Sequence, residues 1–372
     1  MKLLFISNLF PDTSEPYRGL DNACLLHHLR AKGCEIQVLS PRPTLPWRSG
    51  DRTMRPDDAP LSPRYLGVPY IPKLGGLANH HLMARALRKT WDFSPDVILA
   101  SWMFPDACAV SQIAREKGLP FAAIAQGSDV HGYLRSGLRR RAIVRSMETA
   151  SAVITRSAEL ARLLADAGVS QAKLFPIYNG VDTATFHPGD KREARIKLGI
   201  SPDRPLVLYV GNFYTVKNPL LLVKTMQSLP ELDLVMIGGG PLENEARVLA
   251  GENVTLAGRR SAPEVADYLQ AADVLCVPSW NEGVPNVILE ALHCGRPVVA
   301  SRTGGIPEII KNDMLGSLVT AGDEAELVAA LRRTALHPPP AASIVAHSGP
   351  FVWPYAADAY WELLQNAVAF QR

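Results

Sequence analysis

The sequence is poor in cysteine and has almost no excess of charge of either sign. Its 5 cysteines form no Cys-x-x-Cys pair, which excludes a disulfide framework and a zinc site built on such pairs. The 39 basic and 36 acidic side chains leave a net charge of +3, too small to indicate nucleic-acid binding. We therefore expect a cytoplasmic chain with no nucleic acid among its partners.

Long uncharged hydrophobic runs are also missing. No window approaches the ~18 apolar residues that cross a bilayer. Pro11, Asp12 and Glu15 interrupt the apolar N-terminus before a signal-peptide core is complete, so residues 2–7 are interpreted as a first strand. With 47% hydrophobic and 20% charged residues, the chain can form packed cores, and its 372 residues suggest two or three domains.

Short apolar runs alternate with amphipathic stretches along the chain. In the first half the runs lie at residues 2–7, 35–39, 97–100, 121–125 and 152–155. The same rhythm resumes near residue 206, after a turn at Asn179-Gly180 and a charged segment. This alternation predicts parallel strands covered by helices. The expected fold class is therefore α/β, with two doubly wound, Rossmann-like domains.

These changes in pattern give the expected domain boundaries. We expect an N-terminal domain over residues 1–185, a C-terminal domain over 186–349 and a final helix over 350–372. Residues 41–76 are rich in proline and lack periodicity, which predicts a long surface excursion. Because ligands of such sheets bind outside the carboxyl ends of the strands, a substrate is expected in a cleft between the two domains.

The most informative segment runs from Pro278 to Ile310. A strand ends at Pro278, a loop carries Glu282 and Gly283, and Pro285 stands where a first helical residue would be. The free amides of a helix N-terminus favour an anion such as a diphosphate, and Gly283 lets the backbone approach it closely. Taken alone, Glu282 could be only a charge favoured by the helix dipole.

The whole segment, PSWNEGVPNVILEALHCGRPVVASRTGGIPEII, resembles the signature of retaining, nucleotide-sugar-dependent glycosyltransferases of family 4. Further similar motifs are a loop with Gly19, GSDV at 127–130, NGVD at 179–182, VGNFYTVKN at 210–218 and IGGGP at 237–241. The resemblance covers nearly the entire chain and points to the branch of bacterial capsule, exopolysaccharide and teichuronic acid biosynthesis. It implies the GT-B fold: two facing Rossmann-like domains with a cleft and a C-terminal helix that crosses back to the first.

The resemblance also implies roles for particular residues. Glu282 would be the carboxylate beside the donor sugar, Lys217 would lie against the diphosphate, and Glu290 would hold the ribose hydroxyls. Asp129 would complete the catalytic group. The other donor-binding residues would be Gly19, Asn212, Gly240, Arg259, Gly283, Val284, Pro285 and Asn286.

Two residues depart from the pattern of many relatives. Asn212 stands where an arginine is common, which predicts weaker binding of the diphosphate. Gln126 stands where a histidine is common, so no histidine at this position can contact the donor sugar.

The implied activity is retaining transfer of a hexosyl group from a UDP- or GDP-linked sugar to a saccharide or lipid-linked saccharide in cell-surface polysaccharide synthesis. The sequence has no Asp-x-Asp motif, so neither a metal nor another cofactor is expected. Two alternatives stay open: a weak or inactive nucleotide-sugar-binding protein, and a GT-B-like nucleotide-sugar epimerase.

Five arginines cluster within eleven positions of the first domain. Such a cluster is usually a solvated helix face. Since acceptors in the resembled branch are often built on lipid carriers, it also fits a peripheral contact with anionic headgroups, or with the pyrophosphate of the acceptor. These residues are Arg135, Arg139, Arg140, Arg141 and Arg145.

Overall fold

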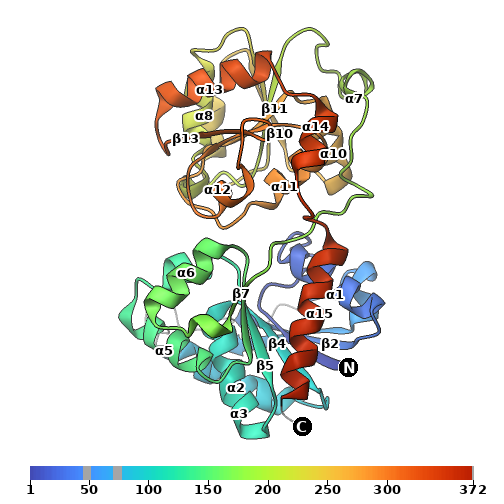
Figure 1. Ribbon diagram of the computed structural model, residues 1–372, viewed down its shortest axis with the longest axis vertical. Coiled ribbons are helices and arrows are strands. Elements are labelled where there is room, and N and C mark those ends of the chain that lie inside the picture. Colours follow the sequence, from blue (N-terminus) through green and yellow to red (C-terminus); the bar gives the residue numbers. More distant parts are fainter. Residues whose placement is uncertain (45–51, 70–77, 371–372) are drawn as a thin grey trace. The chain divides into compact units, whose positions relative to one another are not determined.

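The computed structural model describes residues 1–44, 52–69 and 78–370. The chain divides into two compact units (Figure 1). The first combines Met1–Asn179 with Trp353–Arg372, and the second is Gly180–Val352. Each unit contains one parallel sheet with covering helices, so the predicted α/β class with two Rossmann-like domains is confirmed.

The sheet of the first unit has seven strands in the order β3-β2-β1-β4-β5-β6-β7. They are β1 (Lys2–Ile6), β2 (Glu35–Thr44), β3 (Pro63–Pro69), β4 (Val97–Ser101), β5 (Phe121–Ala125), β6 (Ala152–Thr155) and β7 (Leu174–Pro176). Side chains of β1 alternate between two cores, with Leu4 and Ile6 in one and Leu3 and Phe5 in the other. Burial on both faces explains why its central strands are continuous apolar runs.

Helices cover both faces of this sheet. They are α1 (Leu20–Ala31), α2 (Asn79–Thr90), α3 (Cys108–Lys117), α4 (Ser128–Tyr133), α5 (Gly137–Met147), α6 (Ala158–Ala167) and α15 (Trp353–Ala369). The C-terminal helix α15 runs beside α1 (Figure 1) and buries Tyr360 completely in the core that contains Leu3 and Phe5. The expected return of the last helix to the first domain is therefore confirmed.

The prediction of a surface excursion over residues 41–76 is wrong for the part of this segment that the structure describes. Residues 41–44 continue β2, and Pro63–Pro69 form β3, which pairs with β2 in parallel. A 3-10 helix at Pro56–Leu61 precedes β3 and buries Leu61 completely. Proline is compatible with β3 because it is an edge strand. Residues 45–51 and 70–76 lie outside the described residues.

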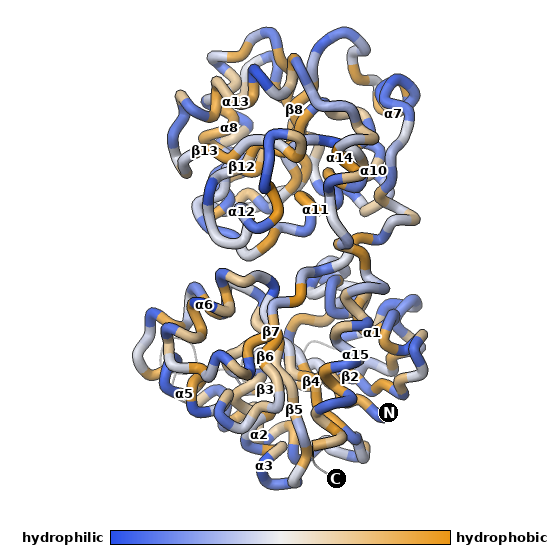
Figure 2. Tube along the Cα trace, viewed as in Figure 1, coloured by the Kyte–Doolittle hydropathy of each residue, from blue (hydrophilic) through white to orange (hydrophobic). Residues whose placement is uncertain are grey.

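The second unit has a six-stranded sheet in the order β10-β9-β8-β11-β12-β13. Its strands are β8 (Leu206–Val210), β9 (Asp233–Ile237), β10 (Val254–Gly258), β11 (Val274–Val277), β12 (Val298–Ser301) and β13 (Gly316–Val319). Its helices are α7 (Lys191–Leu198), α8 (Pro219–Met226), α9 (Glu243–Leu249), α10 (Ala262–Ala271), α11 (Asn286–His293), α12 (Ile306–Ile309), α13 (Glu324–Leu336) and α14 (Ala341–His347). Hydrophobic residues gather in the strands, whereas α7 is largely hydrophilic (Figure 2).

Candidate functional site

The loop after β11 places Glu282 at the carboxyl edge of the second sheet. The helix α11 begins at Asn286, one residue later than expected, because Pro285 has an extended backbone (φ −64°, ψ 126°) and forms the N-cap. Within the described chain, no side chain caps this helix. The N-cap residue Pro285 supplies no side-chain acceptor to the first turn of α11, and the amides of a helix N-terminus attract anions.

The loop after β12 supports the backbone of Glu282. Gly304 has a φ of 54°, and a Cβ there would lie 1.7 Å from the carbonyl oxygen of Glu282. Only glycine permits this approach. The amide of Gly305 donates to the carbonyl oxygen of Gly283 at 2.9 Å. The two consecutive glycines thus fix the loop that carries the predicted donor-binding residues.

Lys217 and Glu282, both predicted to be catalytic, form an ion pair. The Nζ atom of Lys217 lies 2.5 and 2.7 Å from the two carboxylate oxygens of Glu282. The buried Ser279 donates its hydroxyl to Oε1 of Glu282 at 2.8 Å. The Glu282 side chain is 9% exposed and that of Lys217 is 30% exposed, so the pair is partly shielded from water. Sequence reasoning missed Ser279, although its position two residues after the buried strand β11 could have indicated it.

A pocket of about 180 Å³ opens beside this ion pair. Its lining includes Lys217, Glu282, Pro285 and Asn286, which were all predicted to bind the donor. Tyr209 also lines it. Burial, together with the charge of Glu282, raises the pKa of the Tyr209 phenol, so this hydroxyl stays protonated.

Glycines bring two further loops together at the same edge of the sheet. Gly240 has a φ of 153°, and a Cβ there would lie 3.0 Å from backbone atoms of Phe213. The loop after β9 therefore packs against the loop that holds Asn212. Arg259 directly follows β10, and its Nε lies 3.7 Å from the Cβ position of Gly239.

The other predicted residues of this unit lie on the loop before α11 or within α11. Val284 is partly exposed on the loop. Glu290 lies inside the helix, and burial raises the pKa of its carboxyl to about 7. Apart from Glu290 and the first helical residue Asn286, the structure brings the predicted donor residues of this unit into loops at the carboxyl edge.

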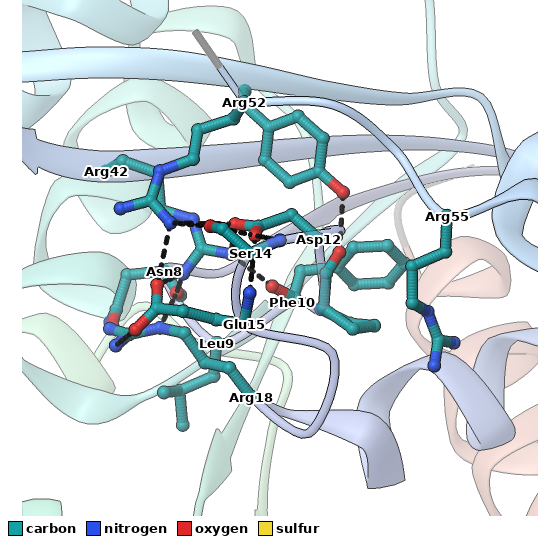
Figure 3. A network of polar contacts seen from close by, with 12 residues as sticks. Asn8, Leu9, Phe10, Asp12, Ser14, Glu15, Arg18, Arg42, Arg52 and Arg55 are labelled. Atoms are coloured by element: carbon teal, nitrogen blue, oxygen red, sulfur yellow. Dashed lines mark hydrogen bonds and ion pairs between the residues drawn. The ribbon is translucent and has the colours of Figure 1, made fainter. Parts of the chain in front are cut away.

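The loop between β1 and α1 in the first unit is held by a buried arginine (Figure 3). Arg42 is 4% exposed and donates to the carbonyl oxygens of Asn8, at 2.8 Å, and Phe10. It also binds Asp12 at 3.0 Å, and Arg52 binds the same carboxylate at 3.1 Å. Burial lowers the pKa of Arg42 to about 10. Sequence reasoning missed this network because Arg42 lies in the segment interpreted as a surface excursion.

Gly19 ends this loop, directly before α1. Its φ is 65°, and a Cβ would lie 2.3 Å from the carbonyl oxygen of Leu9. Asn22 donates to that oxygen at 2.8 Å. Gly19 is therefore required by the local packing, and its role in donor binding stays a prediction.

Asp129 is fully buried and binds backbone amides. Its carboxylate accepts hydrogen bonds from the amides of Met103, Gln126 and Gly127 at 2.8, 3.0 and 2.8 Å. Burial nevertheless raises its pKa. In the structure Asp129 holds together the segments that follow β4 and β5, and its catalytic role stays a prediction.

Gln126, the residue at the common histidine position, belongs to a polar network within the first unit. Its amide donates to Asn22 at 2.9 Å and to Ser101 at 2.7 Å. Its carbonyl accepts from Arg156 at 3.4 Å, and Arg156 also donates to the hydroxyl of Tyr360 at 2.9 Å. Gln126 thus connects the start of α1 with the C-terminal helix.

The structure separates the five clustered arginines into two groups. Arg139 stacks its guanidinium on Tyr133, 4.8 Å from the ring centroid. Arg140 donates to the carbonyl oxygens of Ala167 and Asp166 at the end of α6. Arg139 is half-buried and the other four are exposed, but of those four only Arg135, Arg141 and Arg145 make no hydrogen bond or ion pair within the described residues.

The described residues contain neither a candidate metal-binding cluster nor a candidate membrane-spanning helix. Among residues 1–44, 52–69 and 78–370, no group of three or more His, Cys, Asp or Glu side chains could hold a metal ion. None of the helices in those ranges is both long and apolar enough to cross a bilayer.

Comparisons with known proteins agree with this architecture. The family model described as "Glycosyltransferase Family 4" matches residues 23–185, and the family model described as "Glycosyl transferases group 1" matches residues 204–336. The chain therefore carries both glycosyltransferase domains, one in each unit, and is a glycosyltransferase with the GT-B fold.

Curated relatives support this class. TuaC of Bacillus subtilis (strain 168), a glycosyltransferase named for teichuronic acid biosynthesis, is 29% identical over 83% of this chain and 83% of its own length. The D-inositol 3-phosphate glycosyltransferase of Mycobacterium avium (strain 104) is 28% identical over 72% of this chain. The chain spans 65% of that second protein, just under two thirds of its length.

Solved structures share the fold at low sequence identity. The sucrose-phosphate synthase (tll1590) of Thermosynechococcus elongatus has a TM-score of 0.80 at 23% identity, with both chains fully covered. Anabaena Alr3699/HepE, solved in complex with UDP and glucose, has a TM-score of 0.75 at 20% identity and covers 98% of this chain and 100% of its own.

Proposed function

We propose that this glycosyltransferase is a retaining, metal-independent hexosyltransferase. Its donor would be a UDP- or GDP-linked sugar, and its acceptor a saccharide or lipid-linked saccharide of a cell-surface polysaccharide. The UDP complexes of the structural neighbour HepE and the printed name of TuaC support these two assignments.

The observation that carries the proposal is the Lys217–Glu282 pair beside the N-terminus of α11. A cation at hydrogen-bond distance from a carboxylate, next to a helix N-terminus, suits a ligand with a diphosphate on one side and a developing positive charge on the other. In the proposed complex, Lys217 binds the diphosphate and Glu282 lies beside the sugar. Ser279 keeps the Glu282 carboxylate oriented.

The proposed reaction needs no protein nucleophile. The bond between the anomeric carbon and the diphosphate oxygen breaks, and its electron pair stays on the leaving diphosphate. The acceptor hydroxyl forms the new bond on the same face and passes its proton to a phosphate oxygen of the leaving group. Lys217 and the amides of α11 stabilise the negative charge that grows there, while Asn212 supplies no charge.

The test is a panel of UDP-, GDP- and ADP-linked sugars with purified protein in EDTA, with and without saccharide acceptors. We expect one donor to raise the melting temperature, to be hydrolysed slowly, and to give a product with retained anomeric configuration. Binding without hydrolysis or transfer would favour the nucleotide-sugar-binding alternative. An epimerised sugar would favour the epimerase, and inverted product or activity lost in EDTA would contradict the proposal.

We further propose that the exposed arginines Arg135, Arg141 and Arg145 contact an anionic membrane surface. Neutralising all three with glutamine is expected to abolish sedimentation with vesicles that contain anionic lipid, because each basic side chain near such a surface contributes roughly 1 kcal/mol. Unchanged sedimentation would contradict this contact and leave the transferase proposal intact.

A further inference from the structure

A strained aromatic residue stands at the carboxyl edge of the first sheet. Trp102 directly follows β4 and has a φ of 91°. Such a conformation is rare for a bulky side chain and costs roughly 1–3 kcal/mol. It persists only where the surroundings impose it, and such residues cluster at binding sites.

The backbone around Trp102 is fixed on both sides. Its amide donates to the carbonyl oxygen of Ile124, and its carbonyl accepts from Ala107, both at 3.0 Å. The next amide, that of Met103, donates to the buried carboxylate of Asp129 at 2.8 Å. Asp129 thus acts as a positioning residue for Trp102.

This backbone places the partly exposed indole of Trp102 against a second aromatic ring. The centroids of Trp102 and Tyr133 lie 6.1 Å apart, and the rings are nearly perpendicular at 85°. Phe104, which is 3% exposed, packs on Tyr133 from within at 5.9 Å. A sugar ring carries apolar C–H groups with slight positive polarity on its faces, and these suit the negative face of an aromatic ring.

A cation without a carboxylate partner adjoins these rings. The guanidinium of Arg139 lies 4.8 Å from the centroid of Tyr133 and 5.7 Å from that of Phe104. In the described part of the chain, no carboxylate lies within ion-pair distance of the half-buried Arg139. The buried Arg42, Arg156 and Arg195 each have a carboxylate partner. A guanidinium on aromatic rings is partly desolvated and binds carboxylate or phosphate in a fork.

The acidic groups near this surface do not occupy Arg139. Asp106 and Asp129 are fully buried. Asp106 accepts hydrogen bonds from Asn8, and burial raises its pKa to about 7, which lowers its negative charge near neutral pH. His80, which packs on Phe104 at 5.3 Å, has its pKa lowered to about 4 by burial and is neutral there. Arg139 is therefore the charge that a ligand would meet.

We propose that Trp102, Tyr133 and Arg139 bind an acceptor saccharide whose sugar ring carries a carboxylate or a phosphate. Trp102 and Tyr133 provide the wall for the ring, and Arg139 pairs with the anionic substituent. The inference rests on the proposed transferase function, because only that function makes the bound saccharide an acceptor. The binding surface itself lies within the first unit.

The experiment compares R139Q with R162Q, a substitution of an exposed arginine on α6, in the full-length protein. Acceptor KM and kcat are measured with matched oligosaccharides that end in a uronate, a sugar phosphate or a neutral sugar. We expect R139Q to raise the KM of one charged acceptor by about 10-fold or more and to leave the neutral acceptor unchanged, whereas R162Q matches the wild type. Comparison of the uronate acceptor with the sugar-phosphate acceptor shows which anionic group Arg139 binds.

Two tryptophan variants test the aromatic wall. Trp102→Ala is expected to raise the KM of charged and neutral acceptors alike. Trp102→Gly removes the same ring but is free to adopt a φ of 91°, so it keeps the backbone unstrained if the alanine variant unfolds. Equal KM values for R139Q and R162Q, or for Trp102→Gly and the wild type, would overturn the proposal.

Direct binding separates this inference from the proposed function. Calorimetric titration of the three oligosaccharides without donor requires no turnover. If the wild-type protein neither binds nor hydrolyses any nucleotide sugar, the transferase proposal fails, while Arg139-dependent binding of a charged oligosaccharide would still support the surface. If donor hydrolysis is intact and no charged oligosaccharide binds better than the neutral one, the proposed binding surface is contradicted and the transferase proposal stands.

Discussion

At the scale of single residues, Lys217 has two competing partners in the proposed reaction, Glu282 and the diphosphate. Glu282→Gln removes the charge that holds Lys217, so we expect UDP to bind roughly 2- to 5-fold more tightly, as for a partly exposed ion pair worth up to about 1 kcal/mol. Transfer is expected to fall by about 100-fold or more. Lys217→Met is expected to weaken UDP binding. Isothermal titration and initial rates measure both effects.

The matched control is E324Q, a substitution of an exposed carboxylate at the start of α13. It removes one negative charge from the same unit without removing an ion pair of Lys217, whose salt bridge is with Glu282, and is expected to change neither quantity. If Glu282→Gln weakened UDP binding as much as Lys217→Met, the two side chains would bind UDP together. The prediction that Glu282 and the diphosphate compete for Lys217 would then be wrong.

Glu290 gives the stability of the protein a dependence on pH. Burial raises its pKa from 4.5 to about 7, so between these values the unfolded chain ionises Glu290 more readily than the folded protein does. The contribution of this residue is therefore favourable below pH 4.5 and is lost as the pH rises through 7. We expect the wild type to lose about 2 to 3 kcal/mol relative to Glu290→Gln between pH 5 and 8. Urea unfolding at both pH values measures this difference, and parallel pH profiles would contradict it.

At the scale of elements, the loop after β12 is expected to control the loop of Glu282. Gly304→Ala would place a Cβ 1.7 Å from the Glu282 carbonyl oxygen, whereas Gly199 has a similar positive φ of 66° with nothing within 4 Å of its Cβ position. Alanine in place of either glycine lowers the free energy of unfolding by roughly 1–2 kcal/mol, because the backbone is left-handed at both positions. We expect only Gly304→Ala to lower UDP affinity and transfer, by at least about 10-fold. Equal activity of the two variants would contradict the supporting role of the loop.

The helices and strands that could be predicted from the sequence are those with a strong pattern. The buried runs of β1, β4, β5 and β6 were recognised because both faces are covered, and the strand-loop-helix around Glu282 was recognised from its motif. β3 was missed because Pro63 and Pro69 are typical of loops. Only the pairing of β3 with β2 makes these prolines compatible with a strand.

The side chains that were missed act through contacts between distant segments. Arg42 binds carbonyl groups more than 30 positions earlier in the chain, and Gln126 joins α1 to β4 and, through Arg156, to α15. No local pattern encodes such pairings. The motif predicted which residues gather around Lys217 and Glu282, while the direct pairing of these two side chains required the structure.

At the scale of the whole molecule, the two units differ in how they depend on the C-terminal helix. The second unit is one continuous stretch with its own sheet, so a fragment of residues 180–352 is expected to fold alone and to bind UDP. The first unit needs α15, because Trp353, Tyr360 and Leu364 cover the core around Leu3 and Phe5.

A chain shortened to residues 1–352 is therefore expected to keep a folded second unit and to lose the cooperative structure of the first. Amide NMR spectra of the fragment, the shortened chain and the full chain measure this outcome. The dispersed signals of the first unit are expected to be missing from the shortened chain and to be present in the full one. A shortened chain that shows both sets of dispersed signals would contradict the dependence on α15.

The order of the segments also matters during synthesis on the ribosome. The first 179 residues leave the exit tunnel long before the helix that completes their core, because the 173 residues of Gly180–Val352 are translated in between. At roughly 5–20 residues per second, this interval lasts about 10–35 s. The nascent first unit thus presents an uncovered hydrophobic face to the chaperones of the cell while the second unit folds, and this face is covered only after α15 has left the exit tunnel.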